Sequence, residues 1–296
     1  MKRYMLSAYQ IDSRPNMLED PPAHWDETAR EAAIVRQSHV REGLERQYGT
    51  AQRDQKAQDF KDLGSFPQSI LGYHNRFLME IRDAFVVGGY YPALTGAGSF
   101  GERLLNNMVI RLYSSFPKSR KYRKARSIAL NGGCDDWNVL IDILKEWDVL
   151  LPEESYQDIS YAAVSDQFRE LKSLRDQAVH YNGEAIEANV RGEALRAIHV
   201  LQSILLRQFG LFAYQPWFMR NTPGVQFVAK NWEHRPFVCE FYLPNCLLVG
   251  PYHRVETRDG QMVIVDDYPY ESIEVSDDEF RDALLLHRHP PSNGPH

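Results

Sequence analysis

The segment SDQFRELKSLRDQAVHYNG, residues 165–183, combines a regular helical pattern with polar groups that could do chemistry. Its apolar residues recur at spacings of three and four, which places them on one face of an amphipathic helix. They are Phe168, Leu171, Leu174, Ala178 and Tyr181. Ser165 is a suitable N-cap and Gly183 a suitable residue just beyond the C-terminus, so the pattern predicts a helix between them.

Three polar residues of this helix are candidates for a functional site: Arg175, Asp176 and His180. Residues five apart on a helix differ by about 140° in direction and about 7.5 Å along the axis, so one helix cannot aim Arg175 and His180 at a single atom. A two-fold axis beside the helix would bring both residues of two chains into one cleft. Asp176 lies four residues before His180 and could orient its imidazole.

The pattern Arg-Asp-x-x-x-His near the end of a helix resembles the Arg-x-x-x-x-His motif of the HEPN superfamily. Known members are helical bundles, usually dimers, and many are metal-independent endoribonucleases. The resemblance implies that Arg175 and His180 match the catalytic pair and that Asp176 matches the polar residue after the arginine, where asparagine is common. The pair lies on a predicted helix in a predicted all-helical region, and this context carries more weight than the pair itself.

Composition excludes several classes of protein. The 296 residues contain no apolar run as long as a membrane helix, and the first residues lack the apolar core of a secretory signal, so we expect a cytoplasmic protein without membrane contact. The three cysteines, Cys134, Cys239 and Cys246, form no Cys-x-x-Cys pair, which argues against a disulfide framework and a zinc site. We expect neither metal nor cofactor. Because the net charge is −6, RNA binding would need a local basic patch.

The first half of the chain predicts a series of helices. Residues 25–63 suggest one long helix with a thin apolar stripe, either a solvated helix on the bundle or an arm that embraces a partner subunit. A core helix follows Pro67 and contains His74, which we interpret as a buried histidine with one hydrogen bond rather than a site residue.

The next helix is expected to begin after a turn at residues 96–99. Ser99 and Glu102 form the pattern of a capping box. Glu102 and Asn106 lie at the edge of the apolar stripe and need partners, so both are candidate supporting residues for a polar site with Arg175.

Residues 118–126 are strongly basic, with six cations and no acid. The cations are Lys118, Arg120, Lys121, Arg123, Lys124 and Arg126. Spaced cations around an aromatic residue, here Tyr122, suit a nucleic-acid backbone with a stacked base. The alternative is a solvated loop that balances the acidic segment 135–158. We expect a surface loop or helix end that holds the RNA backbone on the approach to the Arg175/His180 cleft.

The sequence of the second half of the chain predicts two more core helices, followed by a region in which the helical periodicity is lost. Asp135 or Asp136 can cap a short helix whose Trp137, like Trp147 beyond it, should be buried. A long helix follows Val190. Beyond Gly210 prolines separate short β-prone runs, and Asp259-Gly260 is a strong hairpin signal.

The predicted fold class is mainly α: an antiparallel, HEPN-like helical bundle with a smaller C-terminal β-rich unit. We expect an N-terminal segment with a long helix (1–64), the bundle (65–210), a small β-rich domain (211–286) and a disordered tail (287–296).

Three functions compete. The first is a metal-independent endoribonuclease in a homodimer. The second is a non-catalytic helical module that dimerises and binds RNA or protein. The third is a two-domain regulator whose C-terminal part senses a regulatory protein or ligand.

Overall fold

The computed structural model describes residues 12–67, 69, 71–156, 159–179 and 183–210, with 216–218, 227–229, 236, 237, 241, 253–258 and 261–266 beyond them. Only the backbone is described for residues 72, 154–156, 159–161 and 183–188 and for the strands after 216. The chain divides into a helical unit, 10–68 with 73–208, and a second unit that includes Ser69, Leu71 and the described residues from Phe209 onward. The described residues are mainly helical, with eight α-helices.

The N-terminal helix predicted for residues 25–63 is broken in two. A short 3-10 helix η1 (Asn16–Leu18) precedes α1 (Glu27–Tyr48) and α2 (Arg53–Asp62). Gly49 has a φ of 79° and Gln52 a φ of 55°, and these left-handed residues end one helix and open the next. The prediction of a single long helix was therefore wrong, because helix propensity along the segment does not show where the backbone turns.

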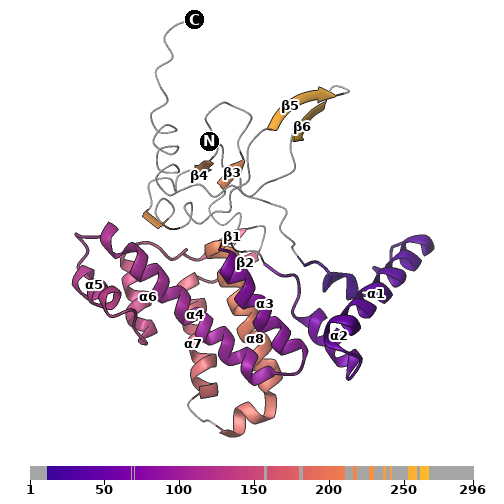
Figure 1. Ribbon diagram of the computed structural model, residues 1–296, viewed down its shortest axis with the longest axis horizontal. Coiled ribbons are helices and arrows are strands. Elements are labelled where there is room, and N and C mark those ends of the chain that lie inside the picture. Colours follow the sequence, from indigo (N-terminus) through magenta and orange to yellow (C-terminus); the bar gives the residue numbers. More distant parts are fainter. Residues whose placement is uncertain are drawn as a thin grey trace, which may run out of the picture. The chain divides into compact units, whose positions relative to one another are not determined.

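The bundle continues with α3 (Gly72–Val86) and α4 (Tyr90–Leu112), which are joined by a tight turn and run in opposite directions (Figure 1). The turn predicted at residues 96–99 was wrong, because this segment lies inside α4. Its glycines allow close helix contact instead. A Cβ at Gly98 would lie 2.6 Å from Cβ of Arg175, and a Cβ at Gly101 would lie 2.6 Å from Cδ2 of Leu171. Ser99 and Glu102 consequently form no capping box.

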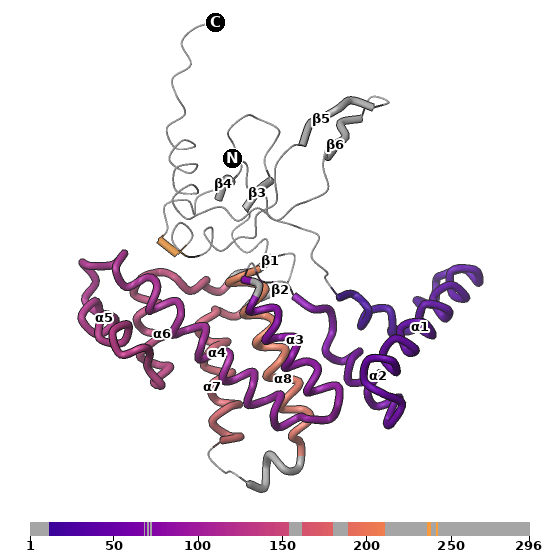
Figure 2. Tube along the Cα trace, in the orientation of Figure 1, coloured from indigo at the N-terminus to yellow at the C-terminus, as the bar shows by residue number. Residues whose placement is uncertain are grey.

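Helix α4 is the centre of the helical unit, since it packs against α5, α6 and α7 (Figure 2). The elements around it are η2 (Tyr113–Ser115), α5 (Tyr122–Leu130), α6 (Trp137–Glu146), α7 (Val164–Val179) and α8 (Gly183–Phe209). Asp136 caps α6 as predicted, its carboxylate accepting from the backbone N–H of Asn138 at 3.0 Å and of Val139 at 3.3 Å. Trp137 and Trp147 are buried, as the sequence predicted.

Helix α7 covers most of the amphipathic segment 165–183. Phe168, Leu171 and Leu174 are buried and form its core face. Ser165 is buried inside the first turn and is not the N-cap, while Gly183 opens α8 rather than following α7. Asn189 has a φ of −151°, and its side chain accepts from the N–H of Gly192 at 3.3 Å. The regular part of α8 therefore starts at the position that the apolar pattern predicted.

A buried polar cluster fastens α2 to the rest of the bundle. Asp59 is fully buried and accepts hydrogen bonds from Tyr90 Oη at 2.8 Å and from Arg191 Nε at 2.9 Å. Arg191 also pairs with Asp62. These bonds and ion pairs give Asp59 and Asp62 a structural role, so neither is a candidate for a site.

Antiparallel strands occur in both units. β1 (Glu154–Tyr156) pairs with β2 (Ile159–Tyr161), which the sequence did not predict. β3 (Pro216–Phe218) pairs with β4 (Phe227–Ala229), and β5 (His253–Arg258) pairs with β6 (Gln261–Asp266) on either side of Asp259-Gly260. A β-rich domain over 211–286 stays a prediction, and the tail 287–296 lies outside the described residues. Among the helices described, none is both long and apolar enough to cross a membrane.

Candidate functional site

Arg175 lies at a close contact between α7 and α4. Because Gly98 has no side chain, the aliphatic part of Arg175 rests directly on the α4 backbone. Its guanidinium then reaches Glu102, with Nη2 3.1 Å from Oε2. It also lies 5.8 Å from the ring centroid of Trp137, in a cation–π geometry. The guanidinium is thus oriented by three helices, and its side chain is still 25% exposed.

Glu102 connects those helices. The same oxygen, Oε2, accepts a hydrogen bond from Nε1 of Trp137 at 3.0 Å. A buried tryptophan needs an acceptor for its N–H, and a partly exposed carboxylate supplies it here. The structure therefore places Glu102 beside Arg175. Trp137 was not predicted as the third member, although its need for an acceptor was a usable signal in the sequence.

Asp176 adds a second carboxylate to the cluster. Its Oδ1 is 3.5 Å from Nη1 of Arg175, and Lys172, one turn earlier on α7, also pairs with it. Lys172, Arg175, Glu102 and Asp176 carry two positive and two negative formal charges, so the cluster is close to neutral. Arg175 has five N–H donors, and two ion pairs leave capacity for a further acceptor at the surface.

Asn106 does not join this cluster. Its side chain accepts from the backbone N–H of Cys134 at 2.8 Å and donates to the carbonyl of Cys134 at 2.9 Å. It also donates to the carbonyl of Glu102 at 3.2 Å. Asn106 therefore fastens the segment before α6 to α4, which is a structural role.

His180 lies outside the described residues, directly after Val179, the last residue of α7. The structure consequently locates the arginine of the Arg175/His180 pair but not the histidine. Whether the two side chains share a site stays a prediction.

The basic run 118–126 spans the turn before α5 and the first part of that helix. Arg120 and Lys121 have acidic neighbours on α6: Glu146 at 3.9 Å and Asp142 at 3.5 Å, respectively. A hydrogen bond from the Ser119 hydroxyl holds the pKa of Glu146 below its ordinary value, so this carboxylate stays charged. The other four cations form no ion pair with any described residue. They are Lys118, Arg123, Lys124 and Arg126, and all are exposed.

The run is not adjacent to Arg175. It follows the C-terminal end of α4, where Tyr113 contacts Tyr122, whereas Arg175 contacts α4 at Gly98 and Glu102. Eleven residues separate Glu102 from Tyr113, or roughly 16 Å along the helix axis. The basic run and the Arg175 cluster are therefore two separate sites, next to different positions along α4.

His74 is a buried side chain of α3 and not a surface group. Its ring packs edge-on against Phe100, with centroids 5.3 Å apart. Burial, together with the positive charge of Arg103 and Arg111, lowers the pKa of His74 to about 3. The imidazole is therefore neutral in the folded protein across the physiological range.

This burial predicts a pH-dependent stability. Between pH 6.5 and about 3 the unfolded chain binds a proton at His74 that the folded protein does not, so stability is complete above pH 6.5 and falls below it. The slope is up to about 1.4 kcal/mol per pH unit. Between pH 6.5 and 5, the free energy of unfolding measured in urea should fall by about 1.6 kcal/mol more in wild type than in His74→Phe. The control is His39→Gln, at an exposed position of α1, which should keep the wild-type dependence of stability on pH. Equal pH dependence in wild type and His74→Phe would contradict the assignment of this effect to His74.

Comparisons with known proteins do not assign the chain. No family model matches it, and neither a curated protein nor a solved structure is significantly similar to it. Among the described residues no group of three or more His, Cys, Asp or Glu side chains is arranged to hold a metal ion. The interpretation of the site therefore depends on its geometry.

Proposed function

We propose that the protein is a metal-independent endoribonuclease of the HEPN type. The observation that carries the proposal is the position of Arg175: it is on a bundle helix, oriented by Glu102 and Trp137, partly exposed, and five residues before His180. A helical bundle is the scaffold that the resemblance implies. An oriented guanidinium offers donors that match the oxygens of a phosphate.

The chemistry would be transfer of a phosphoryl group within the RNA. The 2′-hydroxyl oxygen attacks the adjacent phosphorus, the bond from phosphorus to the 5′-oxygen breaks, and a 2′,3′-cyclic phosphate and a 5′-hydroxyl result. His180 accepts the proton of the 2′-hydroxyl or delivers one to the leaving 5′-oxygen, which suits an ordinary pKa of about 6.5. Arg175 stabilises the charge that develops on the phosphoryl oxygens.

A second copy of the chain is the expected partner. Positions five apart on a helix differ by about 140° in direction, and the sequence predicts a helix that reaches His180. We therefore expect two copies across a two-fold axis to supply Arg175 and His180 to one cleft more readily than one copy does. In this proposal RNA is the substrate and the C-terminal unit is where a regulatory protein or ligand acts.

One observation favours the second function, a non-catalytic module that dimerises and binds RNA or protein. Arg175 already has Glu102 and Asp176 as partners, and the cluster is close to neutral. A guanidinium in a satisfied ion-pair network can serve packing alone. A catalytic role requires that a phosphate displaces at least part of this network.

Incubation of the purified full-length chain with single-stranded RNA in excess EDTA separates the two functions. An endoribonuclease produces fragments that end in 2′,3′-cyclic phosphate, and mass spectrometry identifies this end group. A module that only binds leaves the RNA intact at every protein concentration, which would refute the proposed activity.

The four unpaired cations of the basic run are expected to dominate RNA binding there. The Arg123→Ala, Lys124→Ala, Arg126→Ala triple variant should bind RNA more weakly at every sequence, and the slope of its salt dependence should decrease by about one unit for each phosphate that is no longer bound. Fluorescence anisotropy over a salt series measures both. Arg120→Ala with Lys121→Ala is the matched control and should lose less, because these cations are already paired. If the triple variant bound RNA with unchanged affinity and an unchanged salt-dependence slope, the basic run would be a solvated charge cluster without a role in RNA binding.

A further inference from the structure

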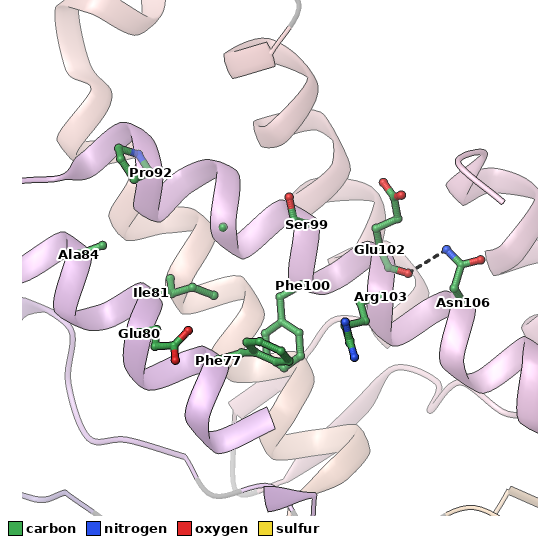
Figure 3. Close-up of a pocket in the computed structure, with 11 residues that line it drawn as sticks. Phe77, Glu80, Ile81, Ala84, Pro92, Ser99, Phe100, Glu102, Arg103 and Asn106 are labelled. Atoms are coloured by element: carbon green, nitrogen blue, oxygen red, sulfur yellow. Dashed lines mark hydrogen bonds between the residues drawn. The ribbon is translucent and has the colours of Figure 1, made fainter. Parts of the chain in front are cut away.

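A groove lies between α3 and α4 on the face of α4 that carries Ser99 and Arg103 (Figure 3). Its volume is about 450 Å³, within the range of sites for small ligands. Phe77 and Ile81 of α3 and Phe100 of α4 form an apolar lining, with the two phenylalanine rings 5.5 Å apart. The groove is therefore large enough for one aromatic ring system.

Small residues of α4 leave this space open. Pro92, Gly96 and Ser99 line the groove at spacings of three and four, so they occupy one face of the helix. A Cβ at Gly96 would already lie 3.2 Å from Cγ1 of Ile81. The two helices are thus close together at Gly96 and the groove opens on either side of it.

The acidic groups at the groove are already neutralised. Glu80 pairs with Arg76 at 3.0 Å, and Glu102 pairs with Arg175 at 3.1 Å. Figure 3 shows the carboxylate of Glu102 directed away from the phenylalanine rings. Neither carboxylate consequently opposes an anionic ligand with a full unpaired charge.

Arg103 is the cation that faces the groove. Its guanidinium carbon lies 5.2 Å from the ring centroid of Phe77 and 5.8 Å from that of Tyr73. No carboxylate in the part of the chain that the structure describes pairs with Arg103. An exposed guanidinium stacked on aromatic rings, beside an apolar groove, offers a planar ligand both a stacking surface and a contact for an anion.

We infer that this groove binds one nucleotide of a single-stranded RNA, with the base against Phe77 and the adjacent phosphate on Arg103. Bases stack on aromatic side chains and arginine planes in single-stranded recognition, largely independently of sequence. A purely apolar ligand would fill the groove but leave Arg103 unused. A nucleotide uses both.

The groove adjoins the Arg175 cluster through a shared residue. Glu102 lines the groove and pairs with Arg175, so the groove and the cluster share one residue of α4. This inference rests on the proposed function for the identity of the ligand, and it specifies a base-binding subsite that shares Glu102 with the Arg175 cluster. Such a subsite would orient the strand before cleavage.

The test is a binding measurement that does not depend on cleavage. A short, fluorescein-labelled, 2′-O-methyl RNA lacks the free 2′-hydroxyl and therefore stays intact. Arg103→Gln and Phe77→Leu should each weaken its binding about tenfold, since stacking on one aromatic side chain has roughly that effect. Arg41→Gln, which removes an exposed arginine of α1, is the control for charge and should bind as wild type does.

A probe with one abasic nucleotide identifies the base contact. In wild type an abasic nucleotide at one position should weaken binding about tenfold, and in Phe77→Leu the same change should have no further effect, because the two changes remove one contact. The inference would be overturned if the abasic nucleotide and Phe77→Leu weakened binding additively, or if Arg103→Gln bound the probe as tightly as wild type does. It would also be overturned if the probe did not bind the wild-type protein.

The two proposals fail in different ways. If the RNA stays intact in the cleavage assay while the binding assay shows a base contact at Phe77, only the proposed nuclease activity is rejected. If the Phe77→Leu variant cleaves RNA and binds the probe as tightly as wild type does, only the proposed base-binding subsite is rejected. Arg103 is on the exposed side of α4, so the Arg103→Gln variant is expected to fold. It therefore still tests the subsite if the Phe77→Leu variant does not fold.

Discussion

Replacing His180 with alanine should slow RNA cleavage by about 10²–10⁴-fold at saturating substrate, because the side chain that moves protons in the proposed reaction is removed. Binding of a non-cleavable RNA should change little. Arg175→Lys should also lose most of the activity, since a lysine keeps the charge but not the fork of donors that fits a phosphate. Initial rates in EDTA, measured with the same RNA for each variant, check both expectations.

The matched control for loss of a cation on the same helix is Arg169→Ala. Arg169 pairs with Asp166 one turn from the start of α7 and does not touch the Arg175 cluster, so wild-type rates are expected. Mixing inactive Arg175→Ala and His180→Ala chains tests the two-chain site: shared cleavage centres would regain activity in mixed dimers. Wild-type cleavage by His180→Ala would refute the catalytic assignment, and a strict monomer in solution would refute the shared site.

Gly101→Ala should destabilise the folded protein by about 1–3 kcal/mol, although alanine favours helix. The added Cβ would lie 2.6 Å from Cδ2 of Leu171 and 2.8 Å from Cη2 of Trp137. Both neighbours are fully buried, so relief requires that α7 or α6 moves away from α4. Chemical denaturation of the two proteins at one pH measures the difference.

The same substitution in α1 provides the control. At Gly43 the nearest atom to an added Cβ is Nη2 of Arg46, at 3.9 Å, so Gly43→Ala should stabilise the protein by roughly 0.5–1 kcal/mol. The two variants change the same atoms in the same secondary structure with opposite expected signs. Stabilisation by Gly101→Ala would show that α4 and α7 are not in close contact there.

What the sequence determined by itself is the periodic part of the fold. Apolar spacing placed the core faces of α3, α7 and α8, and the pair Asp135 and Asp136 indicated the start of α6, because helix periodicity and caps are local properties. The same local rules misread the segment around Gly98 as a turn and Ser165 as a cap. Local rules also missed the break between α1 and α2.

Only the tertiary structure decided which side chains meet. Glycine reads as a turn signal in sequence, yet Gly98 and Gly101 are where α7 approaches α4, since a missing Cβ and a flexible backbone look alike until the neighbouring helix is known. That approach brings Arg175 to Glu102 and Trp137, which are 73 and 38 residues away in the chain. The sequence identified Arg175 as a candidate and Glu102 as a possible partner. Packing determined that Trp137 joins them and that Asn106 does not, because ion pairs and stacking depend on distance in space and not on spacing along the chain.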